Sequence, residues 1–300
     1  MRKRLVPPCA IVLGVCLLAG NAMAQRRRVS TNVNDRNQAI TDCRQIQIEF
    51  DRKDAITEED QLTIPQSQIS TLQIRPSSNS GVYVTGWDGS DYIVKTCKAV
   101  PAGDSYPANQ TLREISTTNA GGRVSVVGPA NSDWVAYLLI QAPRRSSLDL
   151  ESANGPVSFR DLNGRIQARA ANGPVSLTNI NGDVDVTATN GPIHLAGGSG
   201  NQRVNATNGP MHVELTGNRW EGAGLEANTH NGPLTVNLPD FYSSGVRIDT
   251  PRHSPVSCRV TQCSQAVRRS DSPNVIELGG VNAVVRLAAT NGPVSIQPAR

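Results

Sequence analysis

The segment that decides the fold is residues 153–215, which reads ANGPVSFRDLNGRIQARAANGPVSLTNINGDVDVTATNGPIHLAGGSGNQRVNATNGPMHVEL. The tripeptide Asn-Gly-Pro recurs in it every 18 residues and returns twice more further along the chain. Shorter turns lie halfway between, at Asn163-Gly164, Asn181-Gly182 and Ser199-Gly200, so two nine-residue units make one 18-residue repeat. The predicted turn residues of the full repeats are Asn154, Gly155, Asn172, Gly173, Asn190, Gly191, Asn208, Gly209, Asn231, Gly232, Asn291 and Gly292.

The residues that follow each Asn-Gly-Pro alternate between apolar and polar. The third and fifth positions after Asn are apolar, as in Val157 and Phe159, and the residue between them is Ser, Thr or His. The intervening units alternate in the same way, as in Val184 and Val186. A period of two is typical of a β-strand with one buried face. Each 18-residue coil is therefore expected to contribute two short strands.

Asn-Gly between alternating strands is also a strong hairpin signal, so an antiparallel meander is the alternative to a solenoid. In a two-residue hairpin the residue after Gly donates its N–H across the turn, and proline has none to donate. Proline stands there in every full repeat, from Pro156 to Pro293. At a solenoid corner the same proline can open a strand, while Asn or Gly supplies the positive φ. We therefore predict an all-β fold consisting of a single β-solenoid.

Stacked coils place equivalent residues about 4.8 Å apart, so neighbours can be predicted from the alignment. The core should be narrow and made of Val, Ile, Leu and Ala, in agreement with an aromatic content of 4%. No large pocket is implied. The predicted neighbours are a buried alanine ladder, Ala170–Ala188–Ala206, and two outward charge pairs, Arg165 with Asp183 and Asp185 with Arg203.

Segments outside the regular repeats complete the expected organisation. Alternating stretches near residues 73–127, separated by turn clusters, indicate irregular N-terminal coils. Atypical residues before 75 and after 239 are candidates for caps, and poor capping would allow self-association through the ends. The expected divisions are a signal peptide (1–24), a disordered lead (25–40) and a solenoid domain (41–300), with regular repeats at 150–238, an insertion at 239–280 and a closing coil at 281–297.

The first 24 residues have the pattern of a secretory signal peptide. Three basic residues at positions 2–4 precede an apolar stretch at 10–19, and Ala22-Met23-Ala24 supplies an A-x-A cleavage site. The apolar stretch is about half of the roughly 20 residues needed to span a bilayer. We therefore expect export through the secretory pathway, to the periplasm or the outside of the cell, and no transmembrane segment.

The mature chain is expected to be nearly neutral. Removal of the signal peptide takes away three basic residues, which leaves 26 Lys and Arg against 25 Asp and Glu. A polyanion needs a basic face, and the one local cluster, Arg26–Arg28, is interpreted as a solvated N-terminus. Nucleic acid is therefore not expected as a partner.

Four cysteines remain after the signal peptide, an even number in an oxidising compartment. Two disulfides are predicted among Cys43, Cys97, Cys258 and Cys263. The sequence allows three pairings. Pairing Cys258 with Cys263 would close a small loop and leave Cys43 and Cys97 to join the N-terminal part. A zinc site is the competing interpretation, but the C-x2-C spacing and nearby histidines are lacking.

Several segments resemble the bacterial putative-adhesin domain family, exported domains of unknown function. They include Gly81-Val-Tyr-Val-Thr-Gly-Trp-Asp-Gly, the repeated Asn-Gly-Pro units and the final Leu-Ala-Ala-Thr-Asn-Gly-Pro-Val-Ser-Ile. The resemblance covers about residues 70–300 and implies a β-solenoid envelope protein without catalytic residues. The usual family turn is Asn-Gly-Asp or Asn-Gly-Asn, which this chain keeps at Asn181-Gly182-Asp183.

Candidate chemistry is sparse in the sequence. His194 and His212 share one repeat position and form a weak candidate metal pair, and the alternative is two surface side chains in a slot that Ser or Thr fills elsewhere. His230 lies at another register. A calcium-binding β-roll needs an Asp in every turn, and few turns have one. Neither a G-x-S-x-G elbow nor a Cys-His signature is present, so no catalytic residue, metal or cofactor is expected.

The predicted function is a non-enzymatic exported envelope protein. It would be an adhesin or interaction module whose polar repeat face contacts an envelope protein, a surface or a polysaccharide. The alternative is a polysaccharide-active enzyme or glycan-binding module on the same scaffold, which would need converging carboxylates on one face. The aromatic residues that could stack on sugars are also interpreted as buried or capping, namely Trp87, Tyr92, Trp134 and Trp220.

Overall fold

A computed structural model describes residues 28–33, 38–103, 105–250, 254–265, 267–269, 272–280 and 282–299. The predicted signal peptide and its cysteines, Cys9 and Cys16, lie outside the described residues. The all-β class is confirmed: the described residues form one sheet of 21 strands and one of three strands. Within the described ranges the α-helix is α1 (Ser105–Glu114), and no helix there is long and apolar enough to cross a membrane.

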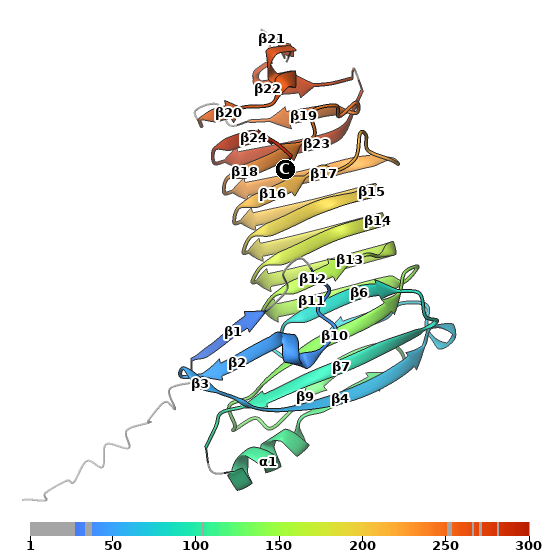
Figure 1. Cartoon of the computed structure of the whole chain (residues 1–300), viewed down its shortest axis with the longest axis vertical. Coiled ribbons are helices and arrows are strands. Elements are labelled where there is room, and N and C mark those ends of the chain that lie inside the picture. Colours follow the sequence, from blue (N-terminus) through green and yellow to red (C-terminus); the bar gives the residue numbers. More distant parts are fainter. Residues whose placement is uncertain are drawn as a thin grey trace, which may run out of the picture.

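The regular repeats form a tall stack of parallel strands above a wider N-terminal part (Figure 1). Each 18-residue repeat contributes one longer and one shorter strand segment, joined at the Asn-Gly-Pro corner. In β14 and β15 the chain continues as strand around the opposite corner. The strands of the stack are β11 (Ser147–Asn154), β12 (Val157–Arg160), β13 (Asn163–Asn172), β14 (Val175–Asn190), β15 (Ile193–Asn208), β16 (Met211–Glu214), β17 (Gly224–Asn231) and β18 (Leu234–Leu238).

Neighbouring repeats pair in parallel with the predicted register of 18 residues. Asn172 pairs with Asn190, and Val175 with Ile193. Residues that alternate inward line one continuous core along the stack. The predicted neighbours are found: the alanine ladder Ala170–Ala188–Ala206 is buried, and Arg165 pairs in register with Asp183 and Asp185 with Arg203.

Glycine is required at the Asn-Gly-Pro corner because successive backbones meet there. Gly191 has φ 141°, and a Cβ atom on it would lie 2.1 Å from the carbonyl oxygen of Gly173. The equivalent glycines of the other repeats show the same approach, at 2.1–2.3 Å. Of the two predicted sources of positive φ, Gly rather than Asn supplies it at this corner.

The order of the C-terminal segments differs from the predicted insertion followed by a closing coil. β23 (Ala283–Asn291) and β24 (Val294–Pro298) pair in parallel with β17 and β18. On their other side they pair with β19 (Gly245–Asp249) and β20 (Val256–Cys258). The last repeat therefore lies inside the stack, and the segment that precedes it in sequence covers the end, as Figure 1 shows.

The covering segment ends the stack with antiparallel pairing. β22 (Ser272–Leu278) pairs antiparallel with β19, and β21 (Val267–Arg269) with β22. A disulfide between Cys258 and Cys263 closes the turn after β20. A change of strand direction gives the terminal parallel strand a partner without offering a template for another parallel repeat. This arrangement agrees with the capping role expected after residue 239.

The N-terminal part is only partly built from coils. β5 (Leu72–Arg75) and β6 (Val82–Trp87) stack in parallel on β11 and β12, as one further rung. β4 (Ile56–Pro65), β7 (Asp91–Val100) and β10 (Val135–Pro143) instead form an antiparallel group. β9 (Arg123–Val127) pairs with β5 in parallel and with β8 (Ser116–Ala120) in antiparallel fashion. Irregular coils were predicted here from the alternation of side chains. Alternation does not encode strand direction, so it could not reveal the antiparallel pairing.

A small antiparallel sheet covers the antiparallel group. It consists of β1 (Val29–Val33), β2 (Ile46–Phe50) and β3 (Lys53–Asp54). β1 corrects the expectation that the whole of 25–40 is a disordered lead. Its hydroxyl-bearing Thr31 contacts the Tyr137 hydroxyl of β10. The apolar residues between the two layers form a second core, Ile40, Ile46, Ile48, Phe50, Tyr83, Cys97, Ala99, Val135, Tyr137 and Leu139.

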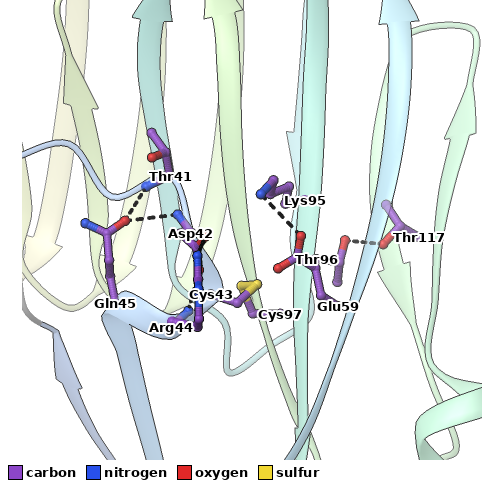
Figure 2. The surroundings of a disulfide bond; sticks show 10 residues. All are labelled: Thr41, Asp42, Cys43, Arg44, Gln45, Glu59, Lys95, Thr96, Cys97 and Thr117. Atoms are coloured by element: carbon purple, nitrogen blue, oxygen red, sulfur yellow. Dashed lines mark hydrogen bonds and ion pairs between the residues drawn. A yellow bond between two sulfur atoms is a disulfide. The ribbon is translucent and has the colours of Figure 1, made fainter.

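The disulfide between Cys43 and Cys97 joins this small sheet to β7 (Figure 2). Cys43 lies in a short 3-10 turn that begins after Asp42, whose side chain accepts a hydrogen bond from the Arg44 amide. Gln45 closes the turn, because its Oε1 accepts from the Asp42 amide at 3.0 Å. A hydrogen bond and ion pair with Arg44 hold the pKa of the Asp42 carboxyl well below its usual range. The turn is thus locally specified, and it places Cys43 against the strand that carries Cys97.

Candidate interaction surface

A ladder of asparagine side chains follows the Asn-Gly-Pro corner from repeat to repeat. Asn172 donates its amide to Asn154 Oδ1 at 2.9 Å, and Asn190 donates to Asn172 at 2.9 Å. The same hydrogen bond runs from Asn208 to Asn190 at 3.0 Å, from Asn231 to Asn208 at 2.9 Å and from Asn291 to Asn231 at 3.0 Å. Each internal amide therefore donates to one neighbour and accepts from the other, which is the pattern of stacked identical side chains.

The ladder extends beyond the residues predicted as turns. Asn154 donates to the carbonyl of Ser78 at 2.8 Å and to Asn79 Oδ1 at 3.3 Å. Ser80 takes the place of the corner glycine, since a Cβ on Gly155 would meet its carbonyl at 2.3 Å. The signal that could have located this rung is the Asn79 turn followed by the alternating strand at 82–87.

The short strands present an outward row of polar side chains on one face of the stack. In-register pairing connects one residue of each rung to the next. The row is half-buried to exposed from Ser158 onward, while Tyr83 at its start is buried under the small sheet. We name this row the short-strand ladder. Its members are Tyr83, Ser158, Ser176, His194, His212, Thr235, Ser295 and Ser257.

The structure brings a carboxylate to the two predicted histidines. The imidazoles of His194 and His212 stack with ring centroids 5.1 Å apart and an interplanar angle of 24°. Glu214 follows His212 by two residues on the same face, and one ligand atom from each of the three side chains lies within 4.8 Å of the others. His230 does not belong to this group, and His253 lies outside the described residues. Sequence reasoning compared equal repeat positions and therefore missed Glu214.

The surroundings of His194 lower its pKa, although the Glu214 carboxylate acts in the opposite direction. Partial burial of the ring lowers the pKa of His194, and the neighbouring His212 lowers it further by repulsion. Asn237, on the next rung, places its Nδ2 3.3 Å from His212 Nε2. The two imidazoles therefore stack on a polar face, with an amide beside the second ring.

The longer strands carry a more charged outward face. Arg75 contacts Asp149 at 2.9 Å and Glu151 at 3.4 Å. Arg203 contacts Glu226 at 3.5 Å. In the described part of the chain the ion pairs do not include the predicted pairs at Asp183 and Asp185, although their registers are as expected. Exposed pairs such as Arg203–Glu226 stabilise weakly, by about 1 kcal/mol or less, whereas Arg75 and Asp149 are partly buried.

The aromatic side chains considered for sugar stacking have internal contacts. Tyr92 is buried, and the indole of Trp220 is largely buried and donates to Gly200 O at 3.1 Å. Trp87 and Trp134 are half-buried and donate to the carbonyls of Asp91 and Pro129. These contacts agree with capping of the stack and of neighbouring turns.

A hollow of about 540 Å³ lies where the small sheet meets the first repeats. Tyr83, Tyr137 and Arg160 contribute to its wall, together with Ser158 and Ser176 of the short-strand ladder. It is therefore continuous with the polar row of the stack.

Comparison with known proteins gives no assignment. No protein-family model and no curated protein matches the chain. Among solved structures, similarity is found to a "putative cell adhesion protein" from Clostridium sporogenes, at 12% identity and TM-score 0.33, covering 81% of this chain and 100% of the other. A "putative adhesin" from Bacteroides fragilis is 10% identical with a TM-score of 0.33, and the match covers 81% of this chain and 97% of the other. A "putative lipid binding protein" from Parabacteroides distasonis is 9% identical with a TM-score of 0.32, and the match covers 80% of this chain and 96% of the other. Similarity this low carries no argument about function.

Proposed function

We propose that this protein is a non-enzymatic, exported interaction module of the cell envelope, built as a β-solenoid. The observation that carries the proposal is the short-strand ladder, which repeats a polar side chain at each rung of one parallel stack. A row of evenly spaced hydroxyl and imidazole groups matches a polymer or an extended protein surface, because both repeat along one direction. The asparagine ladder supports the same rod by joining its corners.

Export is supported by the N-terminal sequence and by the cysteines. The basic, apolar and A-x-A segments of residues 1–24 fit a cleaved signal peptide. The disulfides Cys43–Cys97 and Cys258–Cys263 fit an oxidising compartment. Mass spectrometry of the exported protein should then give an N-terminus at Gln25.

Interaction without catalysis is supported by the chemistry of the two outward faces. The short-strand ladder consists mostly of Ser, Thr and His, which bind through hydrogen bonds. On the charged face, Glu151 and Glu226 face arginines at 3.4–3.8 Å rather than each other. Glycoside hydrolysis instead needs two carboxylates about 5–9.5 Å apart around one bond.

The experiment that tests the proposal compares the two faces of the rod. Purified mature protein is tested on a glycan array, on isolated cell envelopes and in a reducing-sugar assay. A Ser176→Glu/Thr235→Glu variant adds charge to the short-strand ladder, and a Thr187→Glu/Asn205→Glu variant adds the same charge to the other face. Binding should be lost in the first variant and kept in the second. Loss in both variants, or in neither, contradicts the proposed surface.

A glycan-binding module is the second candidate, favoured by the hollow that adjoins the ladder. Two tyrosines and Arg160 line it, and aromatic and guanidinium groups suit sugar rings and their hydroxyls. Binding of a glycan without turnover would specify the ligand of the same module. Turnover of any polymer would overturn the non-enzymatic proposal.

A further inference from the structure

The cluster on the short-strand ladder has the composition of a metal site. It combines two imidazoles with one carboxylate, His194, His212 and Glu214, whose ligand atoms lie within 4.8 Å of one another. Two His and one Glu are a common ligand set for zinc that keeps an open position. The nitrogens of a tetrahedral zinc site are about 3.3 Å apart, since Zn–N bonds are about 2.0–2.1 Å. Rotation of these surface side chains is enough to bring ligand atoms that lie within 4.8 Å of one another to the separation of about 3.3 Å in a zinc site.

The backbone fixes the arrangement of the three side chains. His194 and His212 pair in register on adjacent strands, and Glu214 stands two residues after His212 on the same face. The in-register neighbour of Glu214 is Ala196, whose small side chain leaves room for the carboxylate to turn toward the imidazoles. Adjacent rungs about 4.8 Å apart let both rings reach an ion between them.

The surroundings of His212 suit a metal ligand. Asn237 Nδ2 lies 3.3 Å from its Nε2, and Asn237 Oδ1 is buried without a hydrogen-bond partner. A flip of this amide would let Oδ1 accept from Nε2–H, which is the outer contact that ligating imidazoles ordinarily make. When the amide oxygen of Asn237 faces Nε2–H, the lone pair of Nδ1 is free for a metal. The neighbouring rungs carry Ser176 and Thr235 in the same row, so the run of adjacent histidines consists of His194 and His212.

We propose that His194, His212 and Glu214 bind one divalent transition-metal ion of the zinc class, with an open coordination position directed outward. Imidazole nitrogen and carboxylate oxygen suit zinc better than calcium or magnesium, which prefer all-oxygen sites. The ion would connect adjacent rungs of the stack and place a Lewis-acidic point within the short-strand ladder. This inference stands independently of the proposed interaction function, because it concerns zinc alone.

The test is calorimetric titration of the tag-free mature protein with zinc chloride. Each variant takes the residue that another rung carries at the same position, so that folding is preserved: His194→Ser, His212→Thr and Glu214→Gln. His230→Ser is the matched control, an exposed histidine outside the cluster. We expect one zinc ion per chain, an affinity at least about tenfold weaker in each cluster variant, and no change in the control.

Two further measurements separate a built site from loose association. The visible absorption of bound Co²⁺ should report nitrogen and oxygen ligation in the wild type and vanish in His194→Ser. Zinc should also raise the Tm of the wild type and leave that of His194→Ser unchanged. Equal zinc affinity in the wild type and in either His194→Ser or Glu214→Gln overturns the site.

Discussion

Asn190 donates its side-chain amide to Asn172 Oδ1 at 2.9 Å, and its own Oδ1 accepts from Asn208 at 3.0 Å. The ladder therefore links rungs at a corner where the side chains are exposed. Because amide groups at a surface also bond well to water, each link should contribute modestly, and the sum should matter over many rungs.

Replacement of Asn190 by Ala removes two links at once. The free energy of unfolding should fall by about 1–2 kcal/mol, since a net hydrogen bond contributes about 0.5–1.5 kcal/mol. Urea unfolding followed by circular dichroism measures the difference. Asn201→Ala is the control, an exposed asparagine of the same stack outside the ladder. An equal effect of both variants would assign the loss to strand propensity instead.

Replacement of Gly191 by Ala should be far more damaging than loss of a hydrogen bond. The new Cβ would meet Gly173 O at 2.1 Å, and the residue would also keep φ 141°. We expect a loss of more than about 2 kcal/mol. Gly217→Ala separates the cost of a positive φ from the cost of the steric clash. Gly217 has φ 69°, and no heavy atom lies within 4 Å of the new Cβ. That control should cost about 1–2 kcal/mol, and a similar cost at Gly191 would contradict the close approach.

The regular part of the fold could be predicted because its signals are local. Val157 and Phe159 define a strand face by alternation, and the 18-residue spacing places Val175 beside Val157 without knowledge of any distant contact. Proline after the Asn-Gly of each full repeat disfavours the hairpin alternative, because it has no N–H to donate across the turn. Period, register and core residues therefore follow from the sequence.

The order of the last rungs could not be predicted, because Asn231 and Asn291 are stacked neighbours separated by 60 residues. Nothing in the spacing specifies which segment pairs with a given rung. A chemical indication was available in retrospect: Asn291-Gly292-Pro293 is a regular corner, which needs neighbours on both sides, whereas residues 239–280 lack one. Strand direction in β4 and β7 was likewise invisible, since alternation is the same in both directions.

The candidate site was half-predicted for a similar reason. His194 and His212 share a repeat position, so comparison of repeats identifies them. Glu214 belongs to another row of the stack, and its proximity depends on side-chain reach along a strand as well as across rungs. Comparing residues two apart on the same face would have found it.

The internal position of the last repeat can be tested by truncation of a core side chain. Leu287 is 1% exposed and packs between rungs, as Leu177 does in the middle of the stack. Leu287→Ala and Leu177→Ala should therefore destabilise the protein by similar amounts, about 2–5 kcal/mol each. Chemical denaturation with both variants measures this. A much smaller effect at Leu287 would place the last repeat at an open end of the stack.

Lys98 provides a test of buried charge in the antiparallel group. Its side chain is 3% exposed and lies 2.9 Å from both Glu58 and Asp60. Either carboxylate alone can neutralise the ammonium of Lys98, so Glu58→Gln and Asp60→Asn should each lower the free energy of unfolding only slightly. The double variant leaves the ammonium buried without an acidic partner, with its hydrogen bond to Leu112 O at 3.1 Å retained. It should lower the free energy of unfolding by about 3–5 kcal/mol, more than the sum of the single variants. An additive result would indicate that the ammonium reaches solvent.

The same group predicts the response of stability to pH. Burial by itself would lower the pKa of Lys98, but hydrogen bonds and ion pairs with Asp60 and Glu58 outweigh it and raise the pKa. A group whose pKa is higher in the folded protein than in the unfolded chain stabilises the folded state. This contribution is complete below the pKa of the unfolded chain, about 10.4 for lysine, and it is lost as the pH rises through the pKa of the folded protein. The difference in unfolding free energy between wild type and Lys98→Met should therefore stay constant from about pH 7 to 9 and shrink at higher pH. A decrease already below pH 9 would contradict this ordering.

The disulfide between Cys43 and Cys97 should hold the small sheet in place. It closes a loop of 54 residues, whereas Cys258–Cys263 closes one of five. In the chain-entropy description these loops correspond to about 4 and 2 kcal/mol. A Cys43→Ser/Cys97→Ser variant should therefore lose more stability than Cys258→Ser/Cys263→Ser, as measured by denaturant unfolding.

The two variants should also open in different places. Loss of Cys43–Cys97 removes the covalent link between β7 and the 3-10 turn that precedes β2. Limited proteolysis should therefore cut first within 38–55, while the parallel stack keeps its protection. Loss of Cys258–Cys263 should instead expose the covering segment near 250–265. Because the second core still packs against Tyr137 and Leu139, the small sheet should loosen without unfolding the stack. Simultaneous cleavage throughout the repeats in the first variant would mean that both layers unfold as one unit.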